Sequence, residues 1–248
     1  MINYNYFDEI DTENKAYWLG FLFADGSITT PFRVNKDGSI KNGIYRIEIS
    51  LKEDDKDHLD KFRKELNIEK PLNISKTNYE RSNRCRLYFN SKHMWEILNS
   101  YGCTPKKSLT LEFPNTNIFK DKKLIKHFIR GYVDGDGCLS WCDPQHKRAH
   151  FGILGTMKFL KELQHWLPLE FENVIVKRND ESVSSLYYAG KTAFYIANHL
   201  YKDCSICLER KRERYLEYCR LYLEKYGLQL GKYGELWEEN TVVNSKIA

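Results

Sequence analysis

Two short apolar segments, each ending in Asp-Gly, organise the hydrophobic pattern of this chain. The first runs from Ala16 to Ala24 and is followed by Asp25 and Gly26. The second, at 128–137, has the same plan and ends in Asp136-Gly137, nearly half the chain later. A helix that is apolar on every face must be buried all round, and glycine commonly follows a helix end. Both segments are therefore predicted as buried helices that end at Asp-Gly.

A second pair of matching segments indicates an internal duplication. The sequence LYFNSK at 87–92 resembles LYYAGK at 186–191, at a slightly smaller offset along the chain. Two matches in the same order predict a tandem repeat. We place the first repeat at 1–115, a linker at 116–121, the second repeat at 122–226, and a C-terminal extension without a predicted role at 227–248. The smaller second offset predicts a shorter loop in the second repeat, with the extra residues of the first at 35–43.

Within each repeat, strand and helix periodicities alternate. Strands are predicted near 27–34, 43–51, 71–77 and 84–90, and helices near 54–66 and 91–101. The second repeat has predicted strands near 138–142, 148–154, 173–178 and 184–189, helices near 156–167 and 191–201, and a charged helix near 208–226. The predicted fold class is α+β, as two αββαββα repeats. Each antiparallel sheet is expected to carry helices on one face and to leave the other open.

Composition and charge narrow the class of protein. The 248 residues suit one large unit or two small ones, and 42% hydrophobic residues exclude intrinsic disorder. The net charge of +5 hints at an anionic partner. The longest apolar run is too short to cross a bilayer, and no secretory signal follows Met1. We expect a protein without a membrane span, in the cytoplasm (nucleoid or phage-infected cell) or an organelle.

The seven cysteines leave one alternative open. An odd number without a secretory signal predicts reduced thiols. Cys138 with Cys142, and Cys204 with Cys207, have spacings that could be stretched into a four-thiolate zinc site. This interpretation is disfavoured, because 138–142 is predicted as a strand and structural zinc commonly uses tight turns.

The ends of the two apolar helices carry the candidate chemistry. Small residues one turn apart, at 20 and 24 and at 131 and 135, allow two helix backbones to approach closely. Packing of these helices around a pseudo-two-fold axis would bring Asp25 and Asp136 side by side. Each carboxylate would face the negative end of a helix dipole and repel the other, so a divalent cation would offset both costs. For one copy alone, an Asp-Gly that merely caps a helix is the simpler interpretation; two copies favour a Mg²⁺ or Ca²⁺ site.

These segments resemble two copies of the LAGLIDADG motif, in the single-chain, two-motif form of the homing endonucleases. The resemblance spans about residues 15–215. It implies a DNA-binding saddle of two sheets with the motif helices at the interface. It also implies metal binding by Asp25 and Asp136, with the backbone carbonyls of Ala24 and Gly135 as further ligands. Phe23 departs from the motif where the second copy has an aspartate, at a position that varies in the family.

Lysines at two matching positions are further candidates. Lys92 and Lys191 occupy a place where enzymes of this family often carry a basic residue near the scissile phosphate. A lysine at a helix start also opposes the helix dipole, so its duplication is suggestive, although a solvated surface lysine is an equally simple interpretation.

Recognition of DNA is expected on the open sheet faces, where polar side chains alternate with buried ones. An ordinary solvated face is the alternative for each residue taken singly. The residues predicted to face outward toward DNA are Arg33, Arg46, Glu48, Ser50, Asn73, Ser75, Arg84, Arg86, Tyr88, Arg148, His150, Lys177, Ser185 and Tyr187. Lys107, Arg210 and Lys211 are expected to contact phosphates.

The predicted function is a Mg²⁺-dependent, site-specific double-stranded DNA endonuclease that makes a staggered break by metal-assisted phosphodiester hydrolysis. Ca²⁺ or Mn²⁺ can take the place of Mg²⁺ in such a site. Two unequal halves in one chain predict a monomer that cuts a long asymmetric target, as in intron homing. The alternative is an RNA-splicing maturase that binds intron RNA, or a DNA-binding regulator that does not cleave. An unrelated metal-dependent hydrolase would require a concave small-molecule pocket and would leave the paired sheets unexplained.

Overall fold

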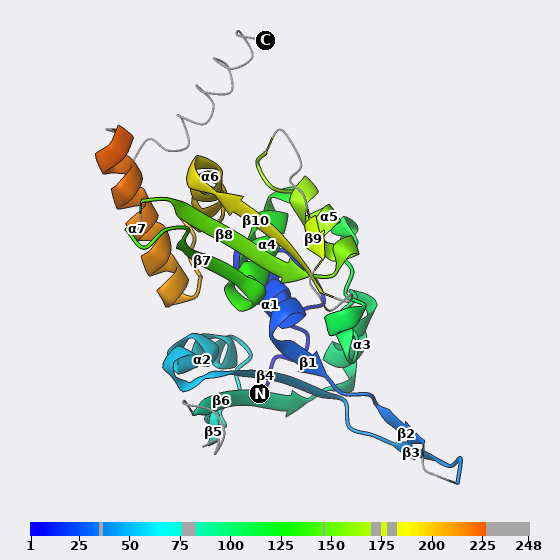
Figure 1. Ribbon diagram of the computed structural model, residues 1–248. Coiled ribbons are helices and arrows are strands. Elements are labelled where there is room, and N and C mark those ends of the chain that lie inside the picture. Colours follow the sequence, from blue (N-terminus) through cyan, green and yellow to red (C-terminus); the bar gives the residue numbers. More distant parts are fainter. Residues whose placement is uncertain (35–36, 76–82, 146, 170–174, 178–182, 227–248) are drawn as a thin grey trace.

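The computed structural model describes residues 1–34, 37–75, 83–145, 147–169, 175–177 and 183–226. Its centre is a pair of packed helices, α1 (Glu13–Ala24) and α4 (Ile125–Asp136), which lie between two four-stranded sheets (Figure 1). The residues of α1 from Ala16 to Phe23 are all buried, as the apolar pattern predicts. The helix starts before the apolar run because the Thr12 side chain caps it by accepting from the Lys15 amide.

The first sheet has the strand order β1-β4-β6-β5, and all its pairings are antiparallel. Its strands are β1 (Gly26–Ile28), β4 (Arg46–Lys52), β6 (Arg84–Asn90) and β5 (Asn73–Ser75). The helices α2 (Lys56–Glu65) and α3 (Lys92–Ser100) belong to the same repeat, with a short 3-10 turn, η1 (Glu53–Asp55), before α2.

The second sheet repeats this order as β7-β8-β10-β9, again antiparallel. Its strands are β7 (Gly137–Trp141), β8 (Ala149–Gly155), β10 (Ser184–Ala189) and β9 (Ile175–Lys177). The helices α5 (Met157–His165) and α6 (Gly190–Tyr201) follow the pattern of α2 and α3, and α7 (Glu209–Tyr226) packs beside β7 (Figure 1). The predicted α+β fold with two αββαββα repeats is confirmed.

The first repeat differs from the prediction in one place. The single strand expected at 27–34 is two strands, β1 and β2 (Phe32–Val34), because Pro31 lacks the amide that a continuing strand would need. Strand β2 pairs with β3 (Ile40–Asn42) in a hairpin that projects from the body of the protein (Figure 1). In the second repeat β7 leads to β8 over a short connection, which fits the shorter loop predicted there. The domain boundaries remain predictions, and the extension 227–248 lies outside the described residues.

Between α3 and α4, the chain passes through three 3-10 turns, η2 (Lys107–Leu109), η3 (Thr116–Ile118) and η4 (Lys122–Leu124). Phe119 in this connection pairs with Ile10, just before α1, in an isolated parallel bridge. The linker is therefore fastened to the chain segment that leads into the first motif helix. Within the described residues, no helix is both long and apolar enough to cross a membrane.

Candidate active site at the ends of the two motif helices

The close approach of α1 and α4 depends on one glycine in each helix. A Cβ atom built on Gly20 would lie 1.9 Å from the carbonyl oxygen of Phe128. A Cβ atom built on Gly131 would lie 1.9 Å from the carbonyl oxygen of Tyr17. Tyr17 and Phe128 occupy the same place in their motifs, each three residues before the glycine of its own helix, so the two contacts are equivalent. The predicted packing of the motif helices around a pseudo-two-fold axis is confirmed at the level of the backbone.

This packing brings the two candidate metal-binding carboxylates together. Asp25 directly follows α1, and Asp136 is the last residue of α4. A Cβ atom built on Gly135 would lie 2.3 Å from the Ala24 Cβ and 3.1 Å from the Asp25 Oδ2. Gly135, the second small residue of the second motif, therefore leaves the space in which Ala24 and the Asp25 carboxylate lie.

The electrostatic environment disfavours charge on both carboxylates. Burial, and then repulsion from Asp25, raise the pKa of Asp136 to about 6. Burial also raises the pKa of Asp25, while Lys211 and Lys107 oppose that shift. Asp25 is exposed over part of its surface, and Asp136 is half-buried, so the pair remains open to solvent and ions. A cation placed between these oxygens would relieve the repulsion.

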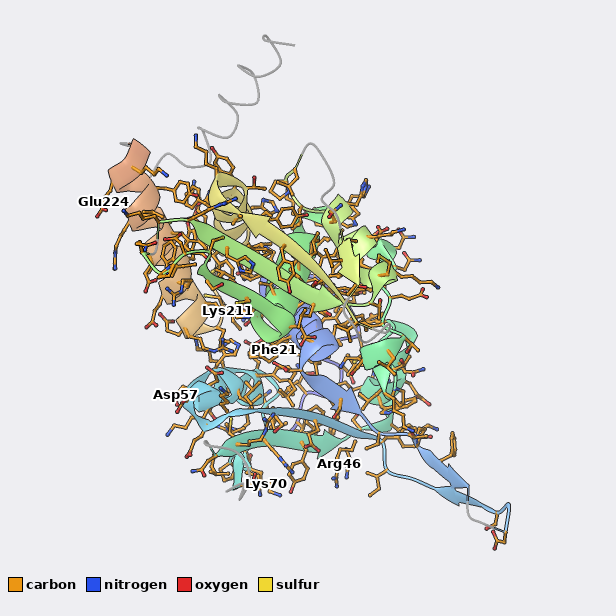
Figure 2. All side chains as sticks on the ribbon, in the orientation of Figure 1. Phe21, Arg46, Asp57, Lys70, Lys211 and Glu224 are labelled. Atoms are coloured by element: carbon orange, nitrogen blue, oxygen red, sulfur yellow. The ribbon has the colours of Figure 1, made fainter. Side chains whose placement is uncertain are left out.

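Two buried lysines lie at the same helix ends. The Lys107 ammonium donates to the carbonyl oxygen of Ala24 at 3.2 Å and to that of Gly26. The Lys211 ammonium donates to the carbonyl oxygens of Asp134 and Gly137, each at 2.8 Å, and to that of Val133. Both lysines therefore neutralise the negative ends of the motif helices. Burial lowers the pKa of Lys211 to about 8, and the side chain lies where the start of α7 meets the centre of the molecule (Figure 2).

The burial of these two lysines corrects one part of the sequence analysis. Lys107 and Lys211 were expected as surface contacts to phosphates, but they are 6% and 4% exposed. Of the residues expected to contact phosphates, only Arg210 is exposed, and its Nε lies 3.3 Å from Asp55 Oδ2, joining α7 to the first repeat. The interior position of the lysines results from long-range packing, which the local sequence does not reveal.

Lys92 and Lys191 lie away from the Asp25–Asp136 site. In the first sheet, Gly26, which follows Asp25, pairs with Ile49, and Ile49 pairs with Leu87. Leu87 is therefore the residue of β6 that lies level with the site, and Lys92 comes five residues later. In the second sheet Gly137, Ile153 and Leu186 align in the same way, and Lys191 is five residues beyond. At about 3.3 Å per residue, β6 and β10 alone carry the chain about 10 Å from the site before α3 and α6 begin.

The contacts of Lys92 agree with a surface position. Its Nζ lies 3.8 Å from Glu96 Oε1 and 5.9 Å from the centre of the Tyr45 ring, and the side chain is 65% exposed. Lys191 is exposed at the start of α6. The side chains that chiefly oppose the raised pKa values of Asp25 and Asp136 are instead those of Lys107 and Lys211.

A buried charged network around α4 was not anticipated. Arg130 is fully buried and donates to Glu13 Oε1 at 2.6 Å and to the carbonyl oxygens of Ile206 and Leu200 at 2.9 and 3.0 Å. Its guanidinium also lies 2.8 Å from His127 Nδ1. The sequence signal was available, since an arginine interrupts the apolar face of the second motif helix.

Asp134 is the second member of this network. Its carboxylate accepts from the Tyr17 hydroxyl at 2.7 Å, the Tyr201 hydroxyl at 2.6 Å and the Leu208 amide at 2.6 Å. Burial raises the pKa of Asp134, and Lys211 and the donated hydrogen bonds oppose this shift. The Tyr17 hydroxyl also lies 2.8 Å from His58 Nε2, so the network reaches α2.

The open face of the first sheet has the predicted alternation. Ile47, Ile49 and Leu51 are buried, and the residues between them face outward. Arg84 Nε donates to Ser50 Oγ at 3.1 Å, and Arg86 Nε lies 4.0 Å from Glu48 Oε1. Of the residues predicted to face DNA, this face holds Arg46, Glu48, Ser50, Asn73, Ser75, Arg84, Arg86 and Tyr88. Arg33 lies in β2, and its side chain is outside the described part of the chain.

The second face departs from the prediction at Ser185. Ser185 is only 2% exposed and donates to the Val176 carbonyl oxygen at 3.3 Å, so its hydroxyl is not available to contact DNA bases. In β9, Val176 is exposed, and Lys177 pairs with Ser184 in the strand register. The side chain of Lys177 itself is not among those described. His150 and Tyr187 lie on the outward side of this sheet, and Arg148, directly before β8, is exposed.

The residues at the helix ends fit a divalent cation better than the alternative zinc site. Mg²⁺ is commonly bound by one or two carboxylates, with water and substrate phosphates completing its shell. Asp25, Asp136 and the Ala24 and Gly135 carbonyls would supply that donor set. The cysteines are free thiols, and the described residues contain no cluster of three or more His, Cys, Asp or Glu side chains that could hold a metal.

No protein-family model matches the sequence, and no curated protein matches it. Among solved structures, the I-LtrWI LAGLIDADG homing endonuclease bound to target DNA is similar, with 12% identity, a TM-score of 0.56, and coverage of 97% of this chain and 96% of that chain. The LAGLIDADG homing endonuclease I-GzeII in complex with its DNA target has 15% identity and a TM-score of 0.55, over 90% and 96% of the two chains.

A third similar structure is I-SmaMI bound to an uncleaved DNA target in the presence of calcium ions. It has 15% identity and a TM-score of 0.53, over 89% of this chain and 95% of that chain. Coverage of both chains is nearly complete in each comparison, so the similarity includes both repeats and the helix pair between them. The resemblance found in the sequence is confirmed by the structure: the chain has the two-repeat fold of the single-chain LAGLIDADG homing endonucleases.

Proposed function

We propose that this protein is a site-specific endonuclease that cuts both strands of double-stranded DNA. The observation that carries the proposal is the pairing of Asp25 and Asp136 between two sheets, beside two buried lysines. A pseudo-two-fold pair of acidic helix ends suits two scissile phosphates, one on each strand. Both halves lie in one chain, which supports action as a monomer on a target that need not be palindromic.

Metal binding, charge stabilisation and DNA binding would be carried out by different residues of the chain. Asp25 and Asp136, with the carbonyls of Ala24 and Gly135, would hold Mg²⁺, or Ca²⁺ or Mn²⁺ in its place. A bound divalent cation supplies an activated water and stabilisation of the charge that develops on the phosphate. Lys107 and Lys211 hold the carbonyl ends of the two helices and place positive charge beside both carboxylates. The open sheet faces would bind DNA, with the exposed Arg148 and Arg210 as contacts to phosphates.

For the basic role in catalysis, Lys107 and Lys211 are better candidates than Lys92 and Lys191. Lys107 and Lys211 oppose the raised pKa values of both carboxylates, whereas Lys92 and Lys191 follow the far ends of β6 and β10, away from the carboxylates. Charge near a scissile phosphate is effective only when it is pre-positioned at short range.

Cleavage of a plasmid library with randomised targets, in Mg²⁺, tests the proposal. A rare subset should be linearised by the wild type, whereas Asp25→Asn and Asp136→Asn should bind the recovered target and leave it uncut. Lys107→Met and Lys211→Met should each lower the cleavage rate by about a hundredfold or more. Binding without cleavage by the wild type would instead favour the non-cleaving regulator. Normal cutting by either aspartate variant would show that the metal assignment is wrong.

A further inference from the structure

The matching registers of the two sheets allow their open faces to be compared position by position. Gly26, Ile49 and Leu87 align across the first sheet, and Gly137, Ile153 and Leu186 align in the same way across the second. Each outward residue of the first sheet therefore has one counterpart in the second. The counterparts of Arg46, Glu48, Ser50, Asn73, Arg86, Tyr88 and Asn90 are His150, Gly152, Leu154, Val176, Ser185, Tyr187 and Ala189.

The first face is built from groups that make directional hydrogen bonds. The Arg46 guanidinium lies 5.0 Å from the centre of the Tyr88 ring, and Arg84 is bound to Ser50 through its Nε and a terminal nitrogen. Arg86 is exposed, with Glu48 as its neighbour. Guanidinium groups held in this way lose less side-chain entropy when they bind a ligand.

The second face is built from rings, aliphatic groups and small residues. The Tyr187 ring covers Gly152, since a Cβ atom there would lie 2.9 Å from two ring atoms. The same ring lies 5.3 Å from the centre of the His150 ring. Leu154 is half-buried, and Val176 is 51% exposed. Within β7, β8, β9 and β10, the described outward positions hold no Asp, Glu, Lys or Arg, and the exposed Arg148 lies directly before β8, at the end of this face.

Base pairs in the major groove differ in the groups that could satisfy these two faces. Guanine presents two acceptors that match a guanidinium, and cytosine presents an amino donor that matches a carboxylate. Thymine presents a methyl group that makes apolar contacts. The first face therefore matches G·C pairs, and the second matches the methyl groups of A·T pairs.

We propose that the two halves of the DNA target are read by different chemistry. The first sheet reads a half-site that contains G·C pairs, through hydrogen bonds from Arg86, Arg46 and Glu48. The second sheet reads an A·T-rich half-site through apolar contacts from Leu154, Val176 and Tyr187, and it discriminates less between bases. This inference rests on the proposed function, because it requires DNA as the ligand.

The first experiment is a selection from a randomised double-stranded oligonucleotide library, by binding in Ca²⁺ and, separately, by cleavage in Mg²⁺. One half of the recovered target should contain G·C pairs at positions where substitution lowers binding about tenfold or more. The other half should prefer thymine, with losses of about fourfold per lost methyl contact. Equal G·C content and equal losses in the two halves would overturn the inference.

Matched variants assign each half-site to its sheet. Arg86→Ala should relax the preference at one or two G·C positions in one half only. Its counterpart Ser185→Ala should leave the whole profile unchanged, because Ser185 is buried and already bound to the backbone. Relaxation in the A·T-rich half, or no relaxation at all, would contradict the assignment.

A gain of preference gives a test that does not depend on loss of folding. Leu154→Arg places a guanidinium on the second face, and it should create a new guanine preference of about tenfold in the A·T-rich half. Circular dichroism would establish that the variant is folded. A folded Leu154→Arg protein with an unchanged profile would count against apolar reading by the second sheet.

The outcomes separate this inference from the proposed function. Asymmetric binding without cleavage would refute the endonuclease and support the inference. Cleavage of a target whose halves are alike would support the endonuclease and refute the inference. If no DNA is bound in either selection, both are refuted.

Discussion

The two motif helices share a backbone arrangement but differ in the side chains around it. In α1, the positions equivalent to Arg130 and Asp134 are Leu19 and Phe23, both fully or almost fully buried among apolar groups. The Phe23 ring packs edge-on against Phe128 at 5.2 Å. In α4, the same two positions carry charges that bind to tyrosine hydroxyls, backbone groups and Glu13.

This difference shows which part of the duplicated unit is constrained by symmetry. Gly20 and Gly131 each face a backbone carbonyl of the other helix, so no larger residue fits at either position. Phe23 and Asp134 touch the partner helix only through side chains, so these positions need only a complete set of partners. An apolar pocket suits Phe23, and three hydrogen-bond donors suit Asp134, but neither environment would accept the other residue.

The largest expected effect comes from breaking the shared contact. Gly20→Ala and Gly131→Ala should each lower the free energy of unfolding by about 3 kcal/mol or more, because the added methyl group would overlap a backbone oxygen. Urea denaturation of both variants would measure this, with Lys61→Ala on the exposed side of α2 as a control. Clearly unequal losses in the two variants would contradict the symmetry of the interface.

The next effect tests the difference between the two repeats. Asp134→Asn should lower the free energy of unfolding by about 3 kcal/mol, because an amide cannot accept from all three donors that surround this site. Its counterpart Phe23→Leu should cost only about 1 kcal/mol, since it keeps an apolar group in an apolar pocket. Denaturation curves of the two variants at pH 7 are the measurement. A loss for Asp134→Asn no larger than that for Phe23→Leu would mean that the network contributes little to stability.

A smaller, pH-dependent effect should appear at the candidate metal site. The folded-state pKa of Asp136 is raised to about 6, so folding takes up a proton between about pH 4 and pH 6. The wild type therefore loses stability as pH rises through this range, and the deficit is complete above pH 6. In the absence of divalent metal, Asp136→Asn should be more stable than wild type by about 1–2 kcal/mol at pH 7, and equal to it below pH 4.

Metal addition sharpens this prediction. Mg²⁺ should stabilise the wild type by binding the folded state, and it should stabilise Asp136→Asn much less. Thermal denaturation over pH 4–8, with chelator and with Mg²⁺, would measure both effects. A variant that is less stable than wild type in chelator at pH 7 would show that burial and repulsion from Asp25 do not destabilise the ionised Asp136 carboxylate.

The smallest effects are expected at the lysines of the matching segments. Lys92→Ala and Lys191→Ala should change the free energy of unfolding by less than about 0.5 kcal/mol, because both side chains are exposed. Cleavage of the recovered target should change less than about threefold, in contrast to Lys107→Met and Lys211→Met. A hundredfold loss of cleavage rate in Lys92→Ala would show that Lys92 does contribute to catalysis.

Much of the fold could be predicted because its signals are local. The apolar run from Ala16 to Ala24, the alternation from Arg46 to Leu51 and the repeated Asp-Gly are visible within a few residues. Pro31 was also visible, and its missing amide explains why one predicted strand is two. The pairing of Asp25 with Asp136 followed from the small residues that precede them, since these allow two helices to approach.

The position of Lys107 and Lys211 beside the carboxylates could not be predicted from local signals. Lys107 and Lys211 each follow the aspartate of their own repeat only after most of that repeat has passed, so no short motif joins them. Lys92 and Lys191 looked equivalent to each other, and they are, but strand register places both at the far end of their sheets. Alternation along β10 places Ser185 on the outward side, and it does not reveal that this side chain is buried and bound to the Val176 carbonyl.

The duplication, the strand and helix pattern, and the two acidic helix ends are readable from the sequence, because each depends on periodicity or on residues adjacent in the chain. The cations beside those carboxylates, the burial of Arg130 and Asp134 by α4, and the difference between the two sheet faces are visible only in the folded protein. These features depend on contacts between segments that are far apart in the chain. Their geometry is set by strand register and helix packing, which no local pattern specifies.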